Sequence, residues 1–291
     1  MGFEYALTKG NGENLPLPGG SGRRGGRKSR GQGWGRNRFK TLILVSSLAE
    51  GYKSIAIDGQ VVLIGLPGWS YVEFARDITA EAKEGEPPTY SSFRLLRLAP
   101  RFNKPKPKLA IKHFRQLVSQ AFPEHYTSKG ELKCGLEVVE RVISTIGGND
   151  MSNIITTEFR SHTSEEVLIL AIKVVKDFLL AECNKPGRKV VLCPPLPRHH
   201  DRFIGDVSDT FPVTITRVWK RVNEEVVDTN CLALDRHTFN LAQQNPHAYH
   251  DGTHVYPQLG RKYLAQPLID SLSTLYGTCE PEPAANSIEV F

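Results

Sequence analysis

Five short, largely apolar runs recur along the chain. Runs of this kind are typical of strands that are buried on both faces of a parallel sheet. Segments with apolar residues at helical spacing separate them, as at Tyr71, Phe74 and Ile78. The pattern therefore predicts strands joined by helices. The runs lie at residues 41–45, 61–64, 142–146, 189–192 and 231–234.

The segments between the runs also carry helix start and stop signals. Thr163 and Glu166 form a capping box, and Lys185-Pro186-Gly187 ends the apolar helix that follows them. Strands that alternate with helices predict an α/β fold, with a parallel sheet, helices on both faces and right-handed crossovers. We expect helices over residues 71–82, 109–122, 167–181 and 214–227, and a last helix that ends near Tyr276.

Polar and glycine-containing turns follow several of these runs. Ser46-Ser47 follows the first run, Pro67-Gly68 the second and Gly147–Asp150 the third, and Asp251–His254 ends the loop after the fifth. Sites in open parallel sheets lie at the carboxyl ends of the strands. The sequence therefore predicts one site at this edge, assembled from segments that are far apart in the chain.

These turns contain the parts that acyl transfer by a serine requires. Asp251 and His254 lie on one turn, so the carboxylate can bind Nδ1–H and leave Nε2 free to take a proton. Ser47 is the candidate nucleophile, and its backbone N–H is a first oxyanion donor. The N–H of Gly68 and the side-chain amide of Asn149 are the second and third donors.

These residues resemble those of the SGNH hydrolases, also called GDSL-type esterases and lipases. The resemblance lies in their order along the chain, which is Ser, Gly, Asn and then Asp-x-x-His. The resemblance covers about residues 40–276, and Gly147–Asp150 matches the family's Gly-x-Asn-Asp block. It implies a flavodoxin-like three-layer α/β/α sandwich with about five parallel strands, and a serine esterase that needs no cofactor or metal. The implied catalytic residues are Ser47, Asp251 and His254, and the implied oxyanion hole is Ser47, Gly68 and Asn149.

The first block departs from the family's Gly-Asp-Ser-Leu. This chain has Val45-Ser46-Ser47-Leu48, and alignment on Leu48 keeps Ser47 in the position of the nucleophile. Ser46 is the alternative nucleophile. The alternative function is a catalytically idle module in a nucleic-acid-binding protein. The substrate expected for an active site is a carboxylic ester, either an acetyl ester or a lipid acyl ester.

The positive charge is concentrated in the first 40 residues. The whole chain carries a formal charge of +6, but nine basic and two acidic side chains leave residues 1–40 at +7, and the other 251 residues at −1. Residues 1–39 are too poor in apolar side chains to fold, so we predict a disordered tail. Such a tail can follow a phosphate backbone without sequence specificity. The expected nucleic-acid-binding residues are Arg23, Arg24, Arg27, Lys28, Arg30, Trp34, Arg36 and Arg38.

A tail of this kind beside an SGNH-like domain resembles, in architecture only, the first-open-reading-frame proteins of some non-LTR retrotransposons. We expect the chain to consist of a tail over residues 1–39, an SGNH-like domain over 40–277 and a C-terminal tail over 278–291. No apolar stretch is long enough to predict a transmembrane segment.

Cysteines and histidines give no metal signature. The five Cys are widely spaced without a C-x-x-C pair, which disfavours a zinc site or disulfide framework and favours an intracellular, reducing compartment. His199-His200-Asp201, His247 and His250 are interpreted as loop residues, with Asp201 and His250 as candidates for the mouth of a pocket.

Overall fold

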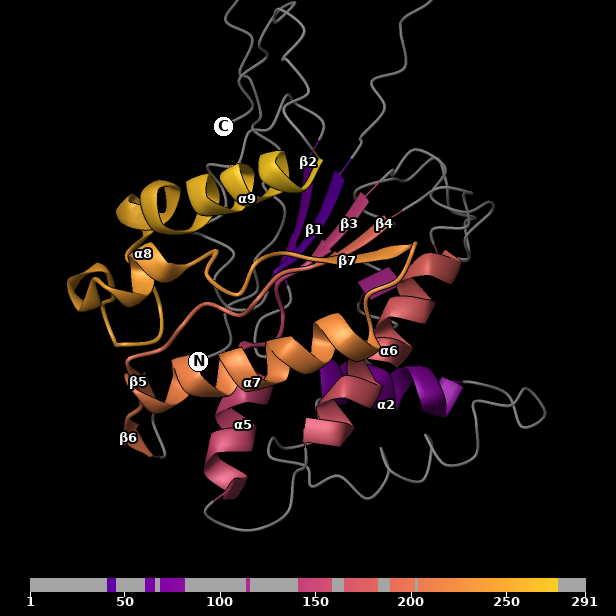
Figure 1. Cartoon of the computed structure of the whole chain (residues 1–291), viewed down its shortest axis with the longest axis horizontal. Coiled ribbons are helices and arrows are strands. Elements are labelled where there is room, and N and C mark those ends of the chain that lie inside the picture. Colours follow the sequence, from indigo (N-terminus) through magenta and orange to yellow (C-terminus); the bar gives the residue numbers. More distant parts are fainter. Residues whose placement is uncertain are drawn as a thin grey trace, which may run out of the picture.

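The computed structural model describes residues 41–45, 61–65, 69–81, 114–115, 141–158, 165–182, 189–201 and 204–276. A five-stranded sheet runs through their centre, and each neighbouring pair of its strands is parallel (Figure 1). Its order, β2-β1-β3-β4-β7, is the flavodoxin-like order, in which the chain reverses direction across the sheet between β1 and β3. The strands are β1 (Thr41–Val45), β2 (Val61–Gly65), β3 (Arg141–Ser144), β4 (Lys189–Leu192) and β7 (Cys231–Ala233).

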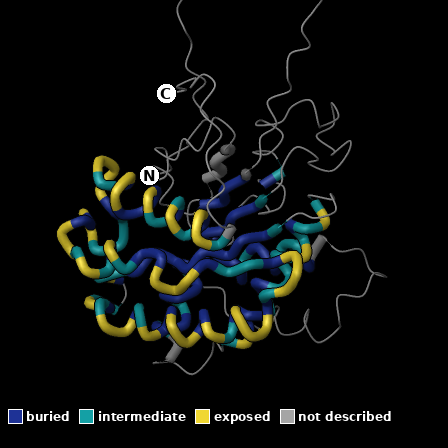
Figure 2. The backbone as a smooth tube through the Cα atoms, turned by 45° about the horizontal axis from the view of Figure 1, so that its top comes forward, coloured by how far each residue is buried: buried dark blue, intermediate teal, exposed yellow. Residues whose placement is uncertain are grey.

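Both faces of the sheet are covered, so the fold is a three-layer α/β/α sandwich. Successive side chains of β1 point to opposite faces, so Leu42 and Leu44 pack in one core cluster and Ile43 and Val45 in the other. The two clusters lie on opposite sides of the sheet, and exposed residues gather on the outer sides of the helices (Figure 2). The strands and the fold class predicted from the apolar runs are confirmed.

Four helices cover one face and the C-terminal helices cover the other (Figure 1). A pair of two-residue antiparallel strands, which the sequence did not indicate, follows β4. The first layer holds α2 (Tyr71–Glu81), α5 (Gly148–Glu158), α6 (Glu165–Glu182) and α7 (Thr210–Glu225). The second holds α8 (Asn240–Gln243), the π-helix η4 (Arg261–Ala265) and α9 (Gln266–Tyr276). The short pieces are β5 (His200–Asp201), β6 (Gly205–Asp206), and the 3₁₀ helices η2 (Pro246–Ala248) and η3 (Pro257–Leu259).

Helix α5 corrects the expectation of a simple turn after the third strand. The segment Gly148–Glu158 contains one Gly, two Asn and two Thr, which have low helix propensity. It buries Met151, Ile154 and Ile155, which lie on one side of a helix and pack in the core below the sheet. Tertiary packing therefore outweighs local propensity, and Asn149 lies in the first turn of a helix.

Two other helical expectations fall partly outside the described residues. Of the helix expected over residues 109–122, only Phe114 and Arg115 are described, and Thr163 of the capping box is not. Helix α7 begins four residues earlier than the predicted Thr214, at Thr210. The added turn buries Phe211, so burial of an aromatic ring accounts for the earlier start.

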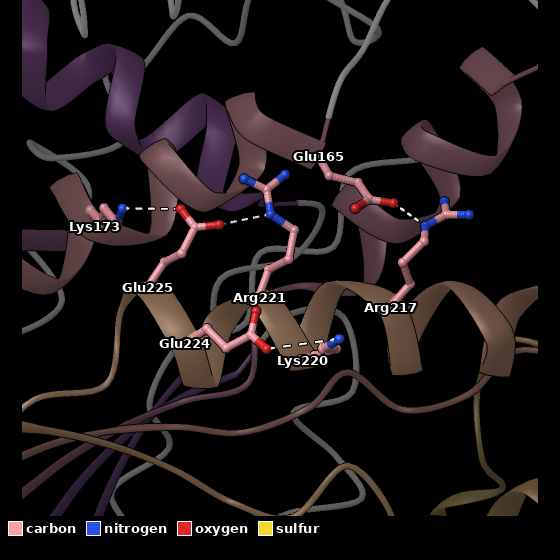
Figure 3. A network of polar contacts seen from close by, with 7 residues as sticks. All are labelled: Glu165, Lys173, Arg217, Lys220, Arg221, Glu224 and Glu225. Atoms are coloured by element: carbon pink, nitrogen blue, oxygen red, sulfur yellow. Dashed lines mark hydrogen bonds and ion pairs between the residues drawn. The ribbon is translucent and has the colours of Figure 1, made fainter.

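A row of ion pairs runs along the outer sides of α6 and α7 (Figure 3). Glu165 pairs with Arg217 across the two helices. Glu225 accepts from Lys173 at 3.3 Å and from Arg221 at 2.7 Å. These side chains are partly exposed, so each pair contributes little to stability. The buried apolar side chains of the two helices supply most of the stability.

A proline explains the π-helical turn before α9. Pro267 has no N–H, so it cannot donate the i→i−4 hydrogen bond to the carbonyl of Tyr263. The N–H of Gln266 instead bonds to the carbonyl of Arg261, five residues earlier. The widened turn keeps the helix continuous and buries Tyr263, Leu264 and Ala265 against the sheet.

Candidate active site

Asp251 and His254 meet in the loop that precedes the last helix. Nδ1 of His254 lies 2.6 Å from Oδ2 of Asp251. Oδ1 of Asp251 accepts backbone hydrogen bonds from Thr253 (2.8 Å) and His254 (2.7 Å). The carboxylate is thus oriented by its own turn, and it sets the imidazole tautomer that carries its proton on Nδ1. This is the arrangement that a general base needs.

The same contacts keep Asp251 ionised. Partial burial on its own raises the pKa of Asp251, but the hydrogen bonds from His254 and Thr253 outweigh it and hold the pKa below its ordinary value. A carboxylate that stays charged at neutral pH can stabilise an imidazolium as it forms.

Gly252 allows this loop to pack tightly against the segment 198–200. Its φ is +74°, and a Cβ there would lie 2.5 Å from Cβ of His200. The carbonyl of Gly252 accepts hydrogen bonds from the N–H groups of His199 (2.7 Å) and His200 (3.2 Å). Thr253 Oγ1 donates to the carbonyl of His200 at 2.8 Å. The loop that carries the dyad is therefore anchored to residues that follow β4.

We expect Gly252→Ala to cost about 2–3 kcal/mol of stability and to lower ester turnover, because the new Cβ adds a clash to the strain of a positive φ. Gly205 is a matched control, since its φ is +91° but nothing lies within 4 Å of a Cβ built there. Gly205→Ala should cost only about 1–2 kcal/mol and leave turnover unchanged. Urea unfolding and ester kinetics check both variants, and equal effects on turnover would contradict the proposed packing.

Asn149 lies where an oxyanion donor is expected, at the start of α5. Its Nδ2 donates to the carbonyl of Trp69 (3.1 Å), and its Oδ1 accepts from Nη2 of Arg198 (2.9 Å). Nδ2 carries two hydrogens, and the described residues provide an acceptor for one of them. The second N–H is available to a ligand.

Asp150 joins this turn to the start of α2. Its Oδ2 accepts from the N–H of Tyr71 (2.7 Å) and its Oδ1 from the N–H of Val72 (3.2 Å). Ser70 Oγ accepts from the N–H of Glu73 (3.2 Å), so two side chains cap this helix. Burial raises the pKa of Asp150 to about 7, although these hydrogen bonds and one with Ser70 favour its ionised form. The carboxyl of Asp150 therefore holds the segment that directly follows Gly68 beside Asn149.

Gly147 lets the ring of Tyr71 approach the same turn. A Cβ on Gly147 would lie 3.3 Å from the Tyr71 ring. The buried hydroxyl of Tyr71 donates to Oγ of Ser144 at 2.8 Å, which ties α2 to the carboxyl end of β3. A side chain at this position would therefore crowd the Tyr71 ring.

The sequence did not single out Tyr71 or Arg198 as members of the site. Tyr71 was assigned to an apolar helix face, which its burial confirms. Arg198 lies in a proline-rich stretch after β4. A charged side chain near the carboxyl end of a parallel strand is the one signal that could have found it.

His250, Asp251 and His254 place three possible metal-ligand atoms within 4.8 Å of one another. The His250 and His254 rings stack at 5.5 Å, and His250 Nδ1 lies 3.8 Å from Asp251 Oδ2. Two ligands of one tetrahedral zinc stand about 3.3 Å apart, whereas His254 Nδ1 and Asp251 Oδ2 are only 2.6 Å apart. The geometry is that of a hydrogen bond, so it favours a catalytic dyad over a metal centre. Asp201, expected in a loop, is instead buried in β5.

Several predicted site residues lie outside the described residues. These are the two serines, the second oxyanion donor and all the candidate nucleic-acid-binding residues of the tail. The nucleophile, its backbone N–H, the donor at Gly68 and the binding of nucleic acid therefore stay predictions. The bounds of the two tails also stay predictions, because the structure describes no residue before 41 or after 276.

Two further expectations concern membrane and redox environment. Among the described helices, none combines the length and apolar composition that a bilayer crossing requires. Cys193 and Cys231 are buried free thiols, which fits the expectation that cysteine acts here as a small apolar side chain. The compartment stays a prediction.

The chain has the sheet order and layers of a flavodoxin-like α/β/α protein. No family model matches it, and a comparison with curated proteins gave no match. Among solved structures it is similar to a Bacteroides fragilis protein proposed to be an acylhydrolase, at 12% identity and a TM-score of 0.47, covering 82% of this chain and 89% of that one. It is also similar to a GDSL-like lipase from Bacteroides thetaiotaomicron (11% identity, TM-score 0.45, covering 82% and 90%).

A third similar structure is a mutant of an acetyl-xylooligosaccharide esterase from Geobacillus stearmophilus (14% identity, TM-score 0.41, covering 80% of this chain and 94% of that one). At these identities and TM-scores the matches carry no conclusion about this chain. Function has to be inferred from this chain's own residues.

Proposed function

We propose that the protein is a serine esterase that hydrolyses a carboxylic ester through an acyl-enzyme. The observation that carries the proposal is the 2.6 Å contact between His254 Nδ1 and Asp251 Oδ2, in a turn that also gives the carboxylate two backbone hydrogen bonds. A histidine held in this way presents Nε2 for proton transfer. Side chains of Asp251 and His254 are 43% and 31% exposed, so a substrate can reach them.

The segment 198–200 supports the proposal because it connects the base to a candidate oxyanion donor. His199 and His200 hold the carbonyl of Gly252 in the dyad loop. Arg198, in the same segment, donates to the side chain of Asn149. The loop that carries the base and the amide with a spare N–H are therefore parts of one hydrogen-bonded structure.

In the proposed reaction His254 takes the proton of Ser47 Oγ as that oxygen attacks the ester carbonyl. The negative charge on the carbonyl oxygen is stabilised by the N–H groups of Ser47 and Gly68 and by the amide of Asn149. Asp251 stabilises the imidazolium, which then protonates the departing alcohol. Water, activated by the same histidine, attacks the acyl-enzyme and releases the acid.

Ser47 is proposed as the nucleophile because it follows β1 by two residues. Val45, the last residue of β1, pairs with Gly65, and Leu44 pairs with Ser144 at the end of β3. The chain therefore leaves β1 at the carboxyl edge of the sheet, where β3 also ends before the turn that carries Asn149. Acetyl and lipid acyl esters are both proposed substrates of this chemistry.

Labelling with a fluorophosphonate probe tests the proposal. We expect the wild type and Ser46→Ala to be labelled and Ser47→Ala not to be, because the probe reacts only with an activated serine. Loss of labelling in Ser46→Ala alone would move the nucleophile to Ser46. A folded wild type that takes no label would contradict the proposal and favour the idle module, in which the basic tail carries the function.

A further inference from the structure

We propose that Arg198 is a positioning residue for the oxyanion hole, acting on the side-chain amide of Asn149. It orients the amide so that Nδ2 faces the reacting carbonyl, and its charge makes the remaining N–H a stronger donor. The inference rests on the proposed esterase function. It assigns a role to a residue whose hydrogen bonds in the described part of the chain go to Asn149 and Ser152 and not to the dyad.

The contacts of Asn149 leave one orientation for its amide. A guanidinium can only donate hydrogen bonds and a backbone carbonyl can only accept them. Arg198 Nη2 stands 2.9 Å from Oδ1, and the carbonyl of Trp69 stands 3.1 Å from Nδ2. If the amide were flipped, Nδ2 would face the Arg198 donor and Oδ1 would face the Trp69 carbonyl oxygen, and neither hydrogen bond could form. Arg198 and Trp69 therefore determine together where the second N–H of Asn149 points.

Arg198 is itself held in place from several sides. Its Nη1 donates to Oγ of Ser152 at 2.8 Å, one turn further along α5. Its guanidinium lies 5.8 Å from the centre of the Phe211 ring. A Cβ on Gly148 would stand 3.0 Å from Nη2, so glycine there leaves the space that the guanidinium fills. The side chain is therefore positioned over the first turn of α5.

The charge of Arg198 lacks a directly paired anion among the described residues. Burial lowers the pKa of Arg198, while Asp201, Asp251 and Asp150 act at longer range in the opposite direction. Partly buried cations are usually paired. A cation beside Asn149 whose nearest partners are a neutral amide and a hydroxyl is placed to polarise that amide, and through it to favour the negative charge that develops in the transition state.

The hydrogen bond to Oδ1 also changes the donor strength of Asn149. A positive charge at the amide oxygen draws electron density from the nitrogen, and hydrogen bonds in such a chain strengthen one another. The ground-state ester carries little charge on its carbonyl oxygen, whereas the tetrahedral intermediate carries a full one. The effect of Arg198 is therefore expected in kcat more than in KM.

The test measures kcat and KM for p-nitrophenyl acetate in Arg198→Met, Asn149→Ala and the double variant. We expect Arg198→Met to lower kcat about 10- to 100-fold, somewhat less than loss of a whole oxyanion donor, with KM changed less than about twofold. In the Asn149→Ala background the same substitution should have little further effect, because Arg198 acts through that amide. Independent, multiplying losses would overturn the inference, as would an unchanged kcat in Arg198→Met.

Ser152→Ala is the matched control. It removes the other hydrogen bond of the guanidinium and leaves the contact with Asn149 in place. We expect kcat within about threefold of wild type, because the contact that orients the amide is kept, although Ser152 is buried and the lost hydrogen bond lowers stability. A loss as large as that of Arg198→Met would indicate a general role in holding α5 and would overturn the positioning role.

Arg198→Lys keeps the charge and provides the test if the methionine variant does not fold. Lysine is a point donor without the planar fork, so a loss of about 3- to 10-fold in kcat is expected, again only while Asn149 is present. Equal losses with and without Asn149 would overturn the inference. A wild type without turnover and without fluorophosphonate labelling would be a different failure, that of the esterase function itself.

Discussion

Replacing His254 by alanine is expected to lower kcat for ester hydrolysis by about 10⁴- to 10⁶-fold, because the nucleophile then has no base to take its proton. The change removes the imidazole that lies 2.6 Å from Asp251. It does not remove the oxyanion donors, so a small residual rate above that of water is expected. Steady-state hydrolysis of p-nitrophenyl acetate measures the loss.

His250 offers a matched control for this substitution. Its ring stacks on that of His254 at 5.5 Å, with 12° between the planes, but its Nδ1 is 3.8 Å from Asp251 Oδ2, beyond hydrogen-bond distance. His250→Ala therefore removes a neighbouring ring of the same type and should change kcat less than about fivefold. Similar losses in the two variants, or full activity in His254→Ala, would refute the role given to the dyad.

Asp150→Ala is expected to lower the free energy of unfolding by about 2–4 kcal/mol, because two backbone N–H groups at the start of α2 lose their acceptor. Those groups belong to Tyr71 and Val72, and the carboxyl is buried. Urea unfolding followed by circular dichroism measures the change. Glu224→Ala is the control, since that carboxylate is 59% exposed and meets Lys220 only at 3.9 Å. It should cost less than about 0.5 kcal/mol.

The same carboxyl is expected to make stability depend on pH. Burial raises the pKa of Asp150 to about 7 from an ordinary value of 3.8. The folded protein therefore keeps a proton that the unfolded chain has released, so the contribution is full below about pH 4 and is lost as the pH rises through 7. In unfolding experiments at pH 5 and pH 8, the stability advantage of the wild type over Asp150→Asn should shrink at the higher pH. A widening gap would contradict the raised pKa.

The layers of the fold could be predicted because each strand is indicated by a few consecutive residues. An apolar run of four or five residues already indicates a buried strand, and all five runs became strands of one sheet. Helix α5 could not be predicted in this way. Its apolar side, Met151, Ile154 and Ile155, indicates a helix only once a sheet is present to cover it. The short pair β5 and β6 has two residues in each strand, too few for any periodicity.

In the site too, contacts between residues close in sequence could be predicted, and contacts between distant residues could not. Asp251 and His254 are three residues apart, so their contact follows from one turn, and the structure brings them together. The partners of Arg198 are Asn149 and Ser152, which lie 49 and 46 residues away. The need for glycine at position 252 comes from His200, 52 residues earlier. Contacts of this kind depend on how strands are ordered, which no local pattern contains.

The central position of β1 has a consequence for synthesis on the ribosome. This first strand pairs with β2 on one side and with β3 on the other, and its register with β3 joins Thr41 to Arg141, 100 residues later. At about 5–20 residues per second, translation takes roughly 5–20 s to supply that second neighbour. During this interval an almost wholly apolar strand has one open edge. The nascent chain therefore passes through a period in which a chaperone that covers such edges would protect it from aggregation.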